Sequence, residues 1–193
     1  MNNQIKIIRE KLSLSDKILD KPFLDKLLDK FGSNYKIKDL LTLKLISSIK
    51  RGESYMNNMN NDLENPYDLI KTYFEWETYM LWGIGVYNMY WFSTQVAEWY
   101  VVYNKKISTQ KVIWRSKFIF YKQKDSFFYW SVINKNGINR YNIMSPERAF
   151  IQVLKEDKPF SKIPNNVDVQ RLLNMAKKYA TKTIVSKIEK LCI

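Results

Sequence analysis

The amino-acid sequence predicts an α+β protein. A short N-terminal winged-helix-like segment, residues 1–60, precedes a larger domain, residues 61–193, in which helices flank an antiparallel sheet. Three observations support this prediction. Apolar residues recur at helical spacing over residues 5–31. Residues 57–66 are rich in asparagine and end in proline, which is typical of a linker. Between residues 98 and 141 the apolar pattern changes to that of short strands.

The N-terminal segment should begin with two helices. The first is expected near residues 5–12, and Pro22 suits the first turn of the second because that position has no intrahelical N–H bond to lose. Gly32 is a natural stop after it. The residues of the second helix that repeat at helical spacing are Phe23, Leu24, Leu27, Leu28 and Phe31.

A β-hairpin should close this segment. Residues 36–45 could hold one short helix. Two strands are then expected at residues 45–50 and 54–57, with a turn between them. Helices followed by a hairpin with a basic turn are the layout of a winged helix.

The larger domain should begin with one or two aromatic-rich helices over residues 67–92. Its most hydrophobic stretch, residues 79–92, is shorter than the roughly 20 residues that span a membrane, so we interpret it as a buried helix. Strands are then expected over residues 99–103, 112–114, 118–121, 127–133 and 138–142, with a hairpin turn at residues 134–137.

Three helices should end the chain. Ser145 can cap the free N–H groups of the first one, Pro146 fits its first turn, and Glu147 complements the positive end of the helix dipole. We interpret this motif as structural, because capping explains it. Two amphipathic helices are expected around residues 169–176 and 184–191.

The composition excludes several kinds of active site. The chain has no histidine, which removes histidine-dependent nucleophiles and histidine metal sites. Its single cysteine, Cys192, can form no internal disulfide, which fits a reducing cytosol. We therefore expect a cytoplasmic non-enzyme with no cofactor, no metal site and no membrane contact.

The net charge of +13 is unevenly distributed. Residues 1–60 carry twelve Lys and Arg against seven Asp and Glu, residues 61–100 carry one against six, and residues 101–193 carry nineteen against six. Such an excess is often only a solvated surface. It also suits a face that binds a polyanion, because Lys and Arg contacts to phosphate release counterions.

Three features, taken in order, resemble the AbiEi-type antitoxin family. They are Ile49-Lys50-Arg51-Gly52-Glu53-Ser54-Tyr55, the helix expected near residues 79–87 with the strands after it, and Ser145-Pro146-Glu147-Arg148-Ala149-Phe150. The resemblance spans about residues 22–190. It implies a winged-helix domain that binds operator DNA and a C-terminal domain that neutralises a nucleotidyltransferase-like toxin encoded next door. The expected role is then phage defence of the abortive-infection type, with possible regulation of its own transcription.

Carried over by position, the resemblance makes Lys50 and Arg51 of the wing the expected phosphate contacts. Lys36, Lys38 and Lys44 would lie on or beside the preceding helix. Too few residues separate Gly32 from the wing for the usual two helices of a helix-turn-helix. We therefore expect the recognition helix to be missing or fused into residues 36–44.

The toxin should bind the C-terminal helices if charge complementarity governs the interaction. Lys177, Lys178 and Lys182 lie mainly off the apolar stripe of those helices. These three lysines are the expected partner-binding residues.

A metal-dependent nuclease is an alternative. Glu156-Asp157-Lys158, with Asp125 or Glu98, could surround a divalent cation. Residues 156–158 lie at an expected helix end beside Pro159, where ligands would be poorly positioned, so we favour the antitoxin.

A second alternative is another basic nucleic-acid-binding protein. Bases could stack on the aromatic residues of 118–121 and 127–130, between Lys117, Lys122 and Lys124. Alternating aromatic residues on a strand more often indicate that one face belongs to the core.

Overall fold

The computed structural model describes residues 3–60, 65–75, 77–128, 131–134, 141–156 and 159–192. The chain forms two compact units, one of residues 1–76 and 112–116 and one of residues 77–111 and 117–193. The predicted boundary between residues 60 and 61 stays a prediction, and the expected linker falls partly on residues 61–64, outside the described ranges.

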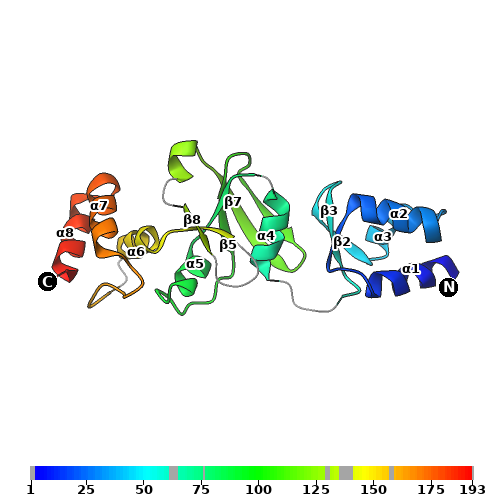
Figure 1. Cartoon of the computed structure of the whole chain (residues 1–193), viewed down its shortest axis with the longest axis horizontal. Helices are drawn as coiled ribbons and strands as arrows, with labels where there is room; N and C mark the ends of the chain where they lie inside the picture. Colours follow the sequence, from blue (N-terminus) through cyan, green and yellow to red (C-terminus); the bar gives the residue numbers. More distant parts are fainter. Residues whose placement is uncertain are drawn as a thin grey trace. The chain divides into compact units, whose positions relative to one another are not determined.

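The first unit contains the predicted winged-helix-like segment (Figure 1). Its elements are α1 (Asn3–Ser13), β1 (Ile18–Asp20), α2 (Lys21–Phe31), α3 (Ile37–Thr42), β2 (Ile46–Lys50) and β3 (Ser54–Asn57). The strands form an antiparallel sheet in the order β1-β3-β2, and β2 with β3 makes the wing. Figure 1 shows the three helices on one side of this sheet. A further helix, α4 (Pro66–Phe74), contacts β2.

One short helix, α3, lies between Gly32 and the wing, in agreement with the expected alternative of a single helix within residues 36–44. The other helix beside it, α2, ends at Phe31, before Gly32, so no second helix is needed between Gly32 and the wing. Whether α3 acts as a recognition helix stays a prediction of the resemblance. Gly32 permits close packing here, because a Cβ atom would lie 2.5 Å from Ile8 Cδ1.

The core of this segment joins all three helices to the sheet. Ile8, Leu24 and Leu40, one from each helix, are fully buried, and the removal of their side chains from water stabilises the segment. Asn57 at the end of β3 is also buried, and its Nδ2 donates to the backbone oxygens of Leu12 at 2.7 Å and Asp16 at 3.0 Å. The end of α1 is thereby held against the sheet.

The second unit is built on a six-stranded sheet in the order β6-β7-β5-β4-β9-β8. Residues 112–116, which include the turn between β6 and β7, are the part of this sheet that belongs to the first unit. The strands are β4 (Tyr79–Trp82), β5 (Tyr100–Asn104), β6 (Thr109–Ile113), β7 (Ser116–Lys122), β8 (Ser131–Asn134) and β9 (Tyr141–Met144). The sheet is mixed rather than antiparallel throughout: β4–β5 and β8–β9 are antiparallel, whereas β4–β9 and β5–β7 are parallel.

The expected buried helix over residues 79–92 is wrong in its first part, which is the central strand β4. Tyr79, Met80 and Leu81 are all buried, so β4 has no polar alternation, and periodicity cannot separate such a strand from a buried helix. Gly83, with φ of 81°, ends β4, and α5 (Ile84–Met89) follows.

The expected strands near residues 99, 112 and 118 are confirmed as β5, β6 and β7. Residues 125–128 instead form a 3₁₀ helix, η1 (Asp125–Phe128), so the strand expected over residues 127–133 is confirmed only for residues 131–133, within β8 (Ser131–Asn134). Residues 129 and 130 lie outside the described ranges. The hairpin turn expected at 134–137 lies mostly outside the described residues.

The three closing helices are confirmed as α6 (Pro146–Lys155), α7 (Val169–Tyr179) and α8 (Lys182–Leu191). Ser145 caps α6 as expected, with its Oγ accepting from the N–H of Arg148 at 3.3 Å. Phe150 of α6 is fully buried, and its ring contacts those of Phe92 and Phe160 at centroid distances of 5.6 and 4.9 Å. None of the described helices is long and apolar enough to cross a membrane.

Replacing Ser145 by alanine should lower the free energy of unfolding by about 1 kcal/mol, because the first turn of α6 loses its side-chain acceptor. Urea unfolding measures this change. Thr183→Ala, at an exposed position of α8, is the control and should leave stability nearly unchanged. Equal effects of the two substitutions would contradict the capping role.

Candidate functional site

The residues predicted to contact DNA lie on α3, after it and on the wing. Lys36 is the N-cap of α3 and Lys38 lies in its first turn, and both side chains are exposed. Leu40 on the same helix is fully buried and anchors α3 to the core. Lys44 is also exposed but lies beyond the other end of α3, with φ of 54°. Lys36 and Lys38 therefore lie at the N-terminal end of α3, and Lys44 lies beyond its C-terminal end.

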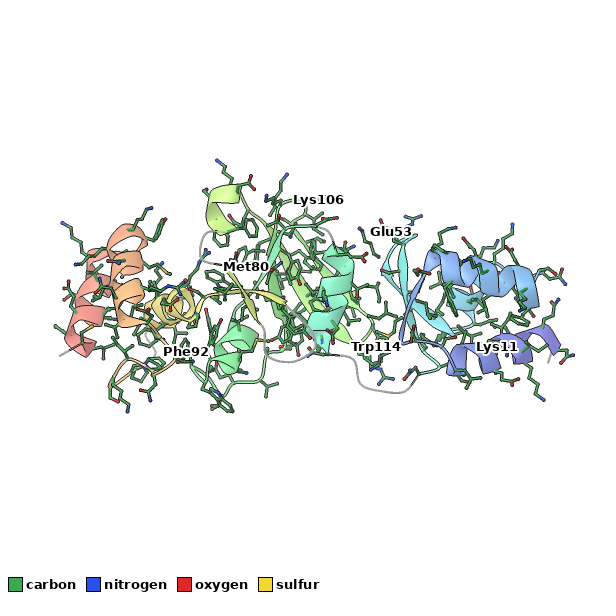
Figure 2. The ribbon with its side chains drawn as sticks, in the orientation of Figure 1. Lys11, Glu53, Met80, Phe92, Lys106 and Trp114 are labelled. Carbon is green, nitrogen blue, oxygen red and sulfur yellow. The ribbon has the colours of Figure 1, made fainter. Side chains whose placement is uncertain are left out.

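The wing presents its two cations differently. Lys50 Nζ lies 2.7 Å from Glu53 Oε2, and the Lys50 side chain is 28% exposed. Arg51 occupies the turn and is exposed. Gly52, with φ of 79°, allows the tight turn, and Glu53 lies at this end of the hairpin (Figure 2). Arg51 is thus the more accessible wing cation, whereas Lys50 is already paired with a carboxylate.

The predicted partner-binding lysines surround the turn between α7 and α8. Lys177 and Lys178 lie in the last turn of α7, where cations stabilise the negative end of the helix dipole. Lys182 is the first residue of α8, and all three side chains are exposed. The Lys178 Nζ lies 5.2 Å from the centroid of the Tyr179 ring. The structure therefore groups these three lysines at one turn.

A cavity of about 280 Å³ lies within the second unit, and we call it the Arg148 cavity. Its described lining residues are Trp82, Tyr103, Phe127, Arg148, Ile151, Gln152, Lys155, Met175 and Tyr179. Arg148 is only 6% exposed, and its guanidinium carbon lies 4.8 Å from the ring centroid of Trp82 and 4.4 Å from that of Phe127. Arginine stacks readily on aromatic faces, so these rings fix the plane of the guanidinium.

Polar contacts also hold Arg148. Its Nη1 donates to the backbone oxygen of Phe127 at 2.7 Å and lies 3.8 Å from the sulfur of Met80. Burial raises the pKa of Tyr103 in the same cavity, and Tyr121 adds to the rise, whereas the positive charge of Arg148 opposes it. A fixed positive charge in a partly desolvated aromatic cavity is an arrangement that attracts anions.

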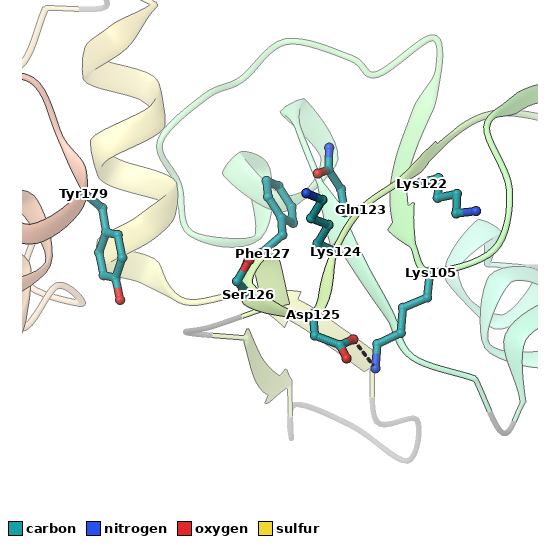
Figure 3. Close-up of a pocket in the computed structure, with 8 residues that line it drawn as sticks. All are labelled: Lys105, Lys122, Gln123, Lys124, Asp125, Ser126, Phe127 and Tyr179. Atoms are coloured by element: carbon teal, nitrogen blue, oxygen red, sulfur yellow. Dashed lines mark ion pairs between the residues drawn. The ribbon is translucent and has the colours of Figure 1, made fainter.

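A wider pocket of about 990 Å³ shares Phe127 and Tyr179 with this cavity, and we call it the lysine pocket. Its other described lining residues are Lys105, Lys122, Gln123, Lys124, Asp125 and Ser126. Figure 3 shows Tyr179 on one side and the residues of 122–127 on the other, with Lys105 paired to Asp125 at 2.5 Å.

The carboxylates considered for a nuclease have separate polar partners. Glu98 accepts from Lys117 at 2.8 Å, Asp125 pairs with Lys105 at 2.5 Å, and Glu156 accepts from the Tyr87 hydroxyl at 3.0 Å. The Lys117 hydrogen bond lowers the pKa of Glu98, and burial, with Glu156 nearby, raises that of Tyr87. Asp157 and Lys158 lie outside the described residues. Within the described part of the chain, no three His, Cys, Asp or Glu residues form a group that could hold a metal ion.

The aromatic residues considered for base stacking belong partly to the core. Phe118 and Phe120 are buried, so neither ring can meet a base, whereas Tyr121 is exposed. Phe127 lies on η1 and lines both pockets, and residues 129 and 130 lie outside the described ranges.

Sequence reasoning missed Arg148 as a site residue. Helix capping accounts for the Ser145-Pro146-Glu147 motif beside it and indicates no role for the Arg148 side chain. A usable signal was present, because Arg148, Ile151, Gln152 and Lys155 have the i, i+3, i+4, i+7 spacing of one helix face. All four line the Arg148 cavity.

In comparisons with known proteins, no family model and no curated protein matches this chain, and the resemblance to AbiEi-type antitoxins stays a prediction.

Proposed function

We propose that this protein is a cytoplasmic antitoxin of a bacterial toxin–antitoxin pair. It neutralises a nucleotidyltransferase-like toxin without catalysis, and it binds the DNA of its own operon through the winged-helix segment. The observation that supports the proposal is the α2–α3 helix pair followed by the β2–β3 hairpin, with exposed cations on α3 and at the turn of the hairpin.

The DNA-binding half of the proposal rests on geometry and charge. A recognition helix reads the major groove from its N-terminal residues, and α3 presents Lys36 and Lys38 there. Arg51 extends from the turn of the wing. Cations at these two places suit contacts with phosphates that set the position of the protein on the duplex.

The antitoxin half rests on the resemblance and on the lysines at the α7–α8 turn. The proposed toxin acts on nucleic acid or nucleotides. Proteins of this kind present either a basic surface that binds polyanions or acidic groups around the reactive centre. Lys177, Lys178 and Lys182 complement the acidic kind of surface directly.

Growth of cells that express the neighbouring reading frame, with and without this protein, tests the proposal. Both genes should be under heterologous promoters, so that repression of the operon cannot contribute. Toxicity that this protein relieves supports the antitoxin. Toxicity that it leaves unchanged contradicts it.

Reversing the charges of Lys177, Lys178 and Lys182 to glutamate should reduce this relief at least about tenfold in surviving colonies, because like charges then meet at the interface. The control reverses Lys6, Lys26 and Lys30, which are exposed on α1 and α2 and carry the same total charge. Circular dichroism should show that both variants remain folded. Equal relief of toxicity by the two variants would contradict a role for the α7–α8 turn in binding the toxin.

A further inference from the structure

The Arg148 cavity and the lysine pocket together carry an excess of positive charge. Arg148 and Lys155 line the cavity, and Lys105, Lys122 and Lys124 line the pocket beside it. Among the described lining residues, Asp125 alone carries negative charge, and it is paired with Lys105. A ligand that enters this region should therefore be an anion.

The walls of the same region are aromatic. Phe127 and Tyr179 line both pockets, and Trp82 and Tyr103 extend the surface inside the cavity. The Tyr103 ring lies 4.6 Å from that of Phe127 and 5.0 Å from that of Trp82. Tyr179 is 38% exposed, so its ring remains accessible at the opening. Aromatic walls favour a ligand that has a planar ring of its own.

Arg148 is unusual among these cations because it is fixed. Stacking on Trp82 and Phe127 and the hydrogen bond to the Phe127 backbone determine its orientation before any ligand arrives. A preorganised guanidinium costs less conformational entropy on binding than a surface lysine. Its charge is also less screened than a charge at the surface.

We propose that the Arg148 cavity binds a nucleotide, with phosphate oxygens near Arg148 and Lys155 and the base against Tyr179 and Phe127. A nucleotide combines the anion and the planar ring that these walls require. The Arg148 cavity, at about 280 Å³, lies near the lower limit of the volumes of small-molecule sites. The lysine pocket, at about 990 Å³, shares two of its lining residues and offers further room for a nucleotide. The source is either a free nucleotide or the phosphorylated end of a nucleic-acid strand, because both present the same chemistry.

Calorimetric titration of the full chain tests the proposal with separate probes. ATP represents the free nucleotide, and a 5′-phosphorylated RNA pentanucleotide represents a strand end. Adenosine and inorganic phosphate supply the two halves of the ligand. Pentaglutamate supplies negative charge without a base and represents an acidic protein segment.

Two exposed positions provide variants that should fold. Lys155→Ala removes a charge, and Tyr179→Ala removes a stacking surface. Each substitution should weaken about tenfold the binding of whichever probe, ATP or the pentanucleotide, binds more tightly. Lys162→Ala, an exposed lysine outside both pockets, is the matched control and should bind like the unaltered protein.

Saturable binding of ATP or of the pentanucleotide, weakened by both pocket variants, supports the proposal, and the tighter probe identifies the source. Binding of neither probe would overturn it. Nucleotide binding that both variants leave intact would also overturn it. Pentaglutamate binding as tightly as the nucleotides would show that the region recognises charge alone and would assign it to an acidic protein partner.

Discussion

Phe150→Ala is expected to lower the free energy of unfolding by about 3–5 kcal/mol, because it opens a cavity in the core of the second unit. The Phe150 ring is fully buried and contacts Phe92 and Phe160, so neighbouring side chains cannot fill the space without moving. Such a loss is a large share of the stability of an ordinary domain. Urea unfolding followed by circular dichroism measures it.

Phe23→Ala is the matched control for this prediction. Phe23 on α2 is 38% exposed, so truncation of its ring should cost much less than truncation of Phe150. A loss below about 1 kcal/mol for Phe150→Ala would contradict the packing of α6 described above.

The double variant Lys38→Ala with Arg51→Ala should bind duplex DNA on the order of 10–100-fold more weakly at about 0.1 M salt. Each phosphate contact contributes about −0.9 to the slope of the logarithm of affinity against the logarithm of salt concentration. The slope should therefore become less steep by about 1.8 when both contacts are lost. The weakening should be similar for all sequences, as expected of phosphate contacts.

Lys162→Ala with Lys190→Ala removes the same charge from exposed positions of the second unit and serves as the control. If the two double variants lose affinity equally, general charge rather than α3 and the wing governs binding. Fluorescence anisotropy with a labelled duplex, at four or more salt concentrations, distinguishes these results.

Elements with a clear local signal could be predicted from the sequence. The Ser145-Pro146 start of α6 follows from capping alone, and the wing follows from two short strands around Gly52. The α+β class and the closing helices rest on periodicity in the same way. Their structures depend on neighbouring residues in the chain, and a single sequence contains that information.

Features that depend on distant parts of the chain could not be predicted. β4 is a strand because β5 and β9 pair with it on either side, and its fully buried sequence has no alternation to indicate this. β1 has three residues and exists through its pairing with β3. The parallel pairs depend on the order of strands in the sheet, which local patterns do not specify.

The candidate site shows the same division. Cations on α3 and on the wing could be identified by their position in the chain. The Arg148 cavity is lined by Trp82, Phe127 and Tyr179, which come from elements far apart in the sequence. Only the lining residues on α6 could be predicted, because they share one face of a single helix.

The most direct test of the account is the affinity of the full chain for the promoter DNA of its own operon, measured across a range of salt concentrations beside an unrelated duplex of equal length. We predict tighter binding to the promoter and a steep loss of affinity with salt for both duplexes. No binding even at low salt, or binding that salt leaves unchanged, would contradict a DNA-binding role for the winged-helix segment.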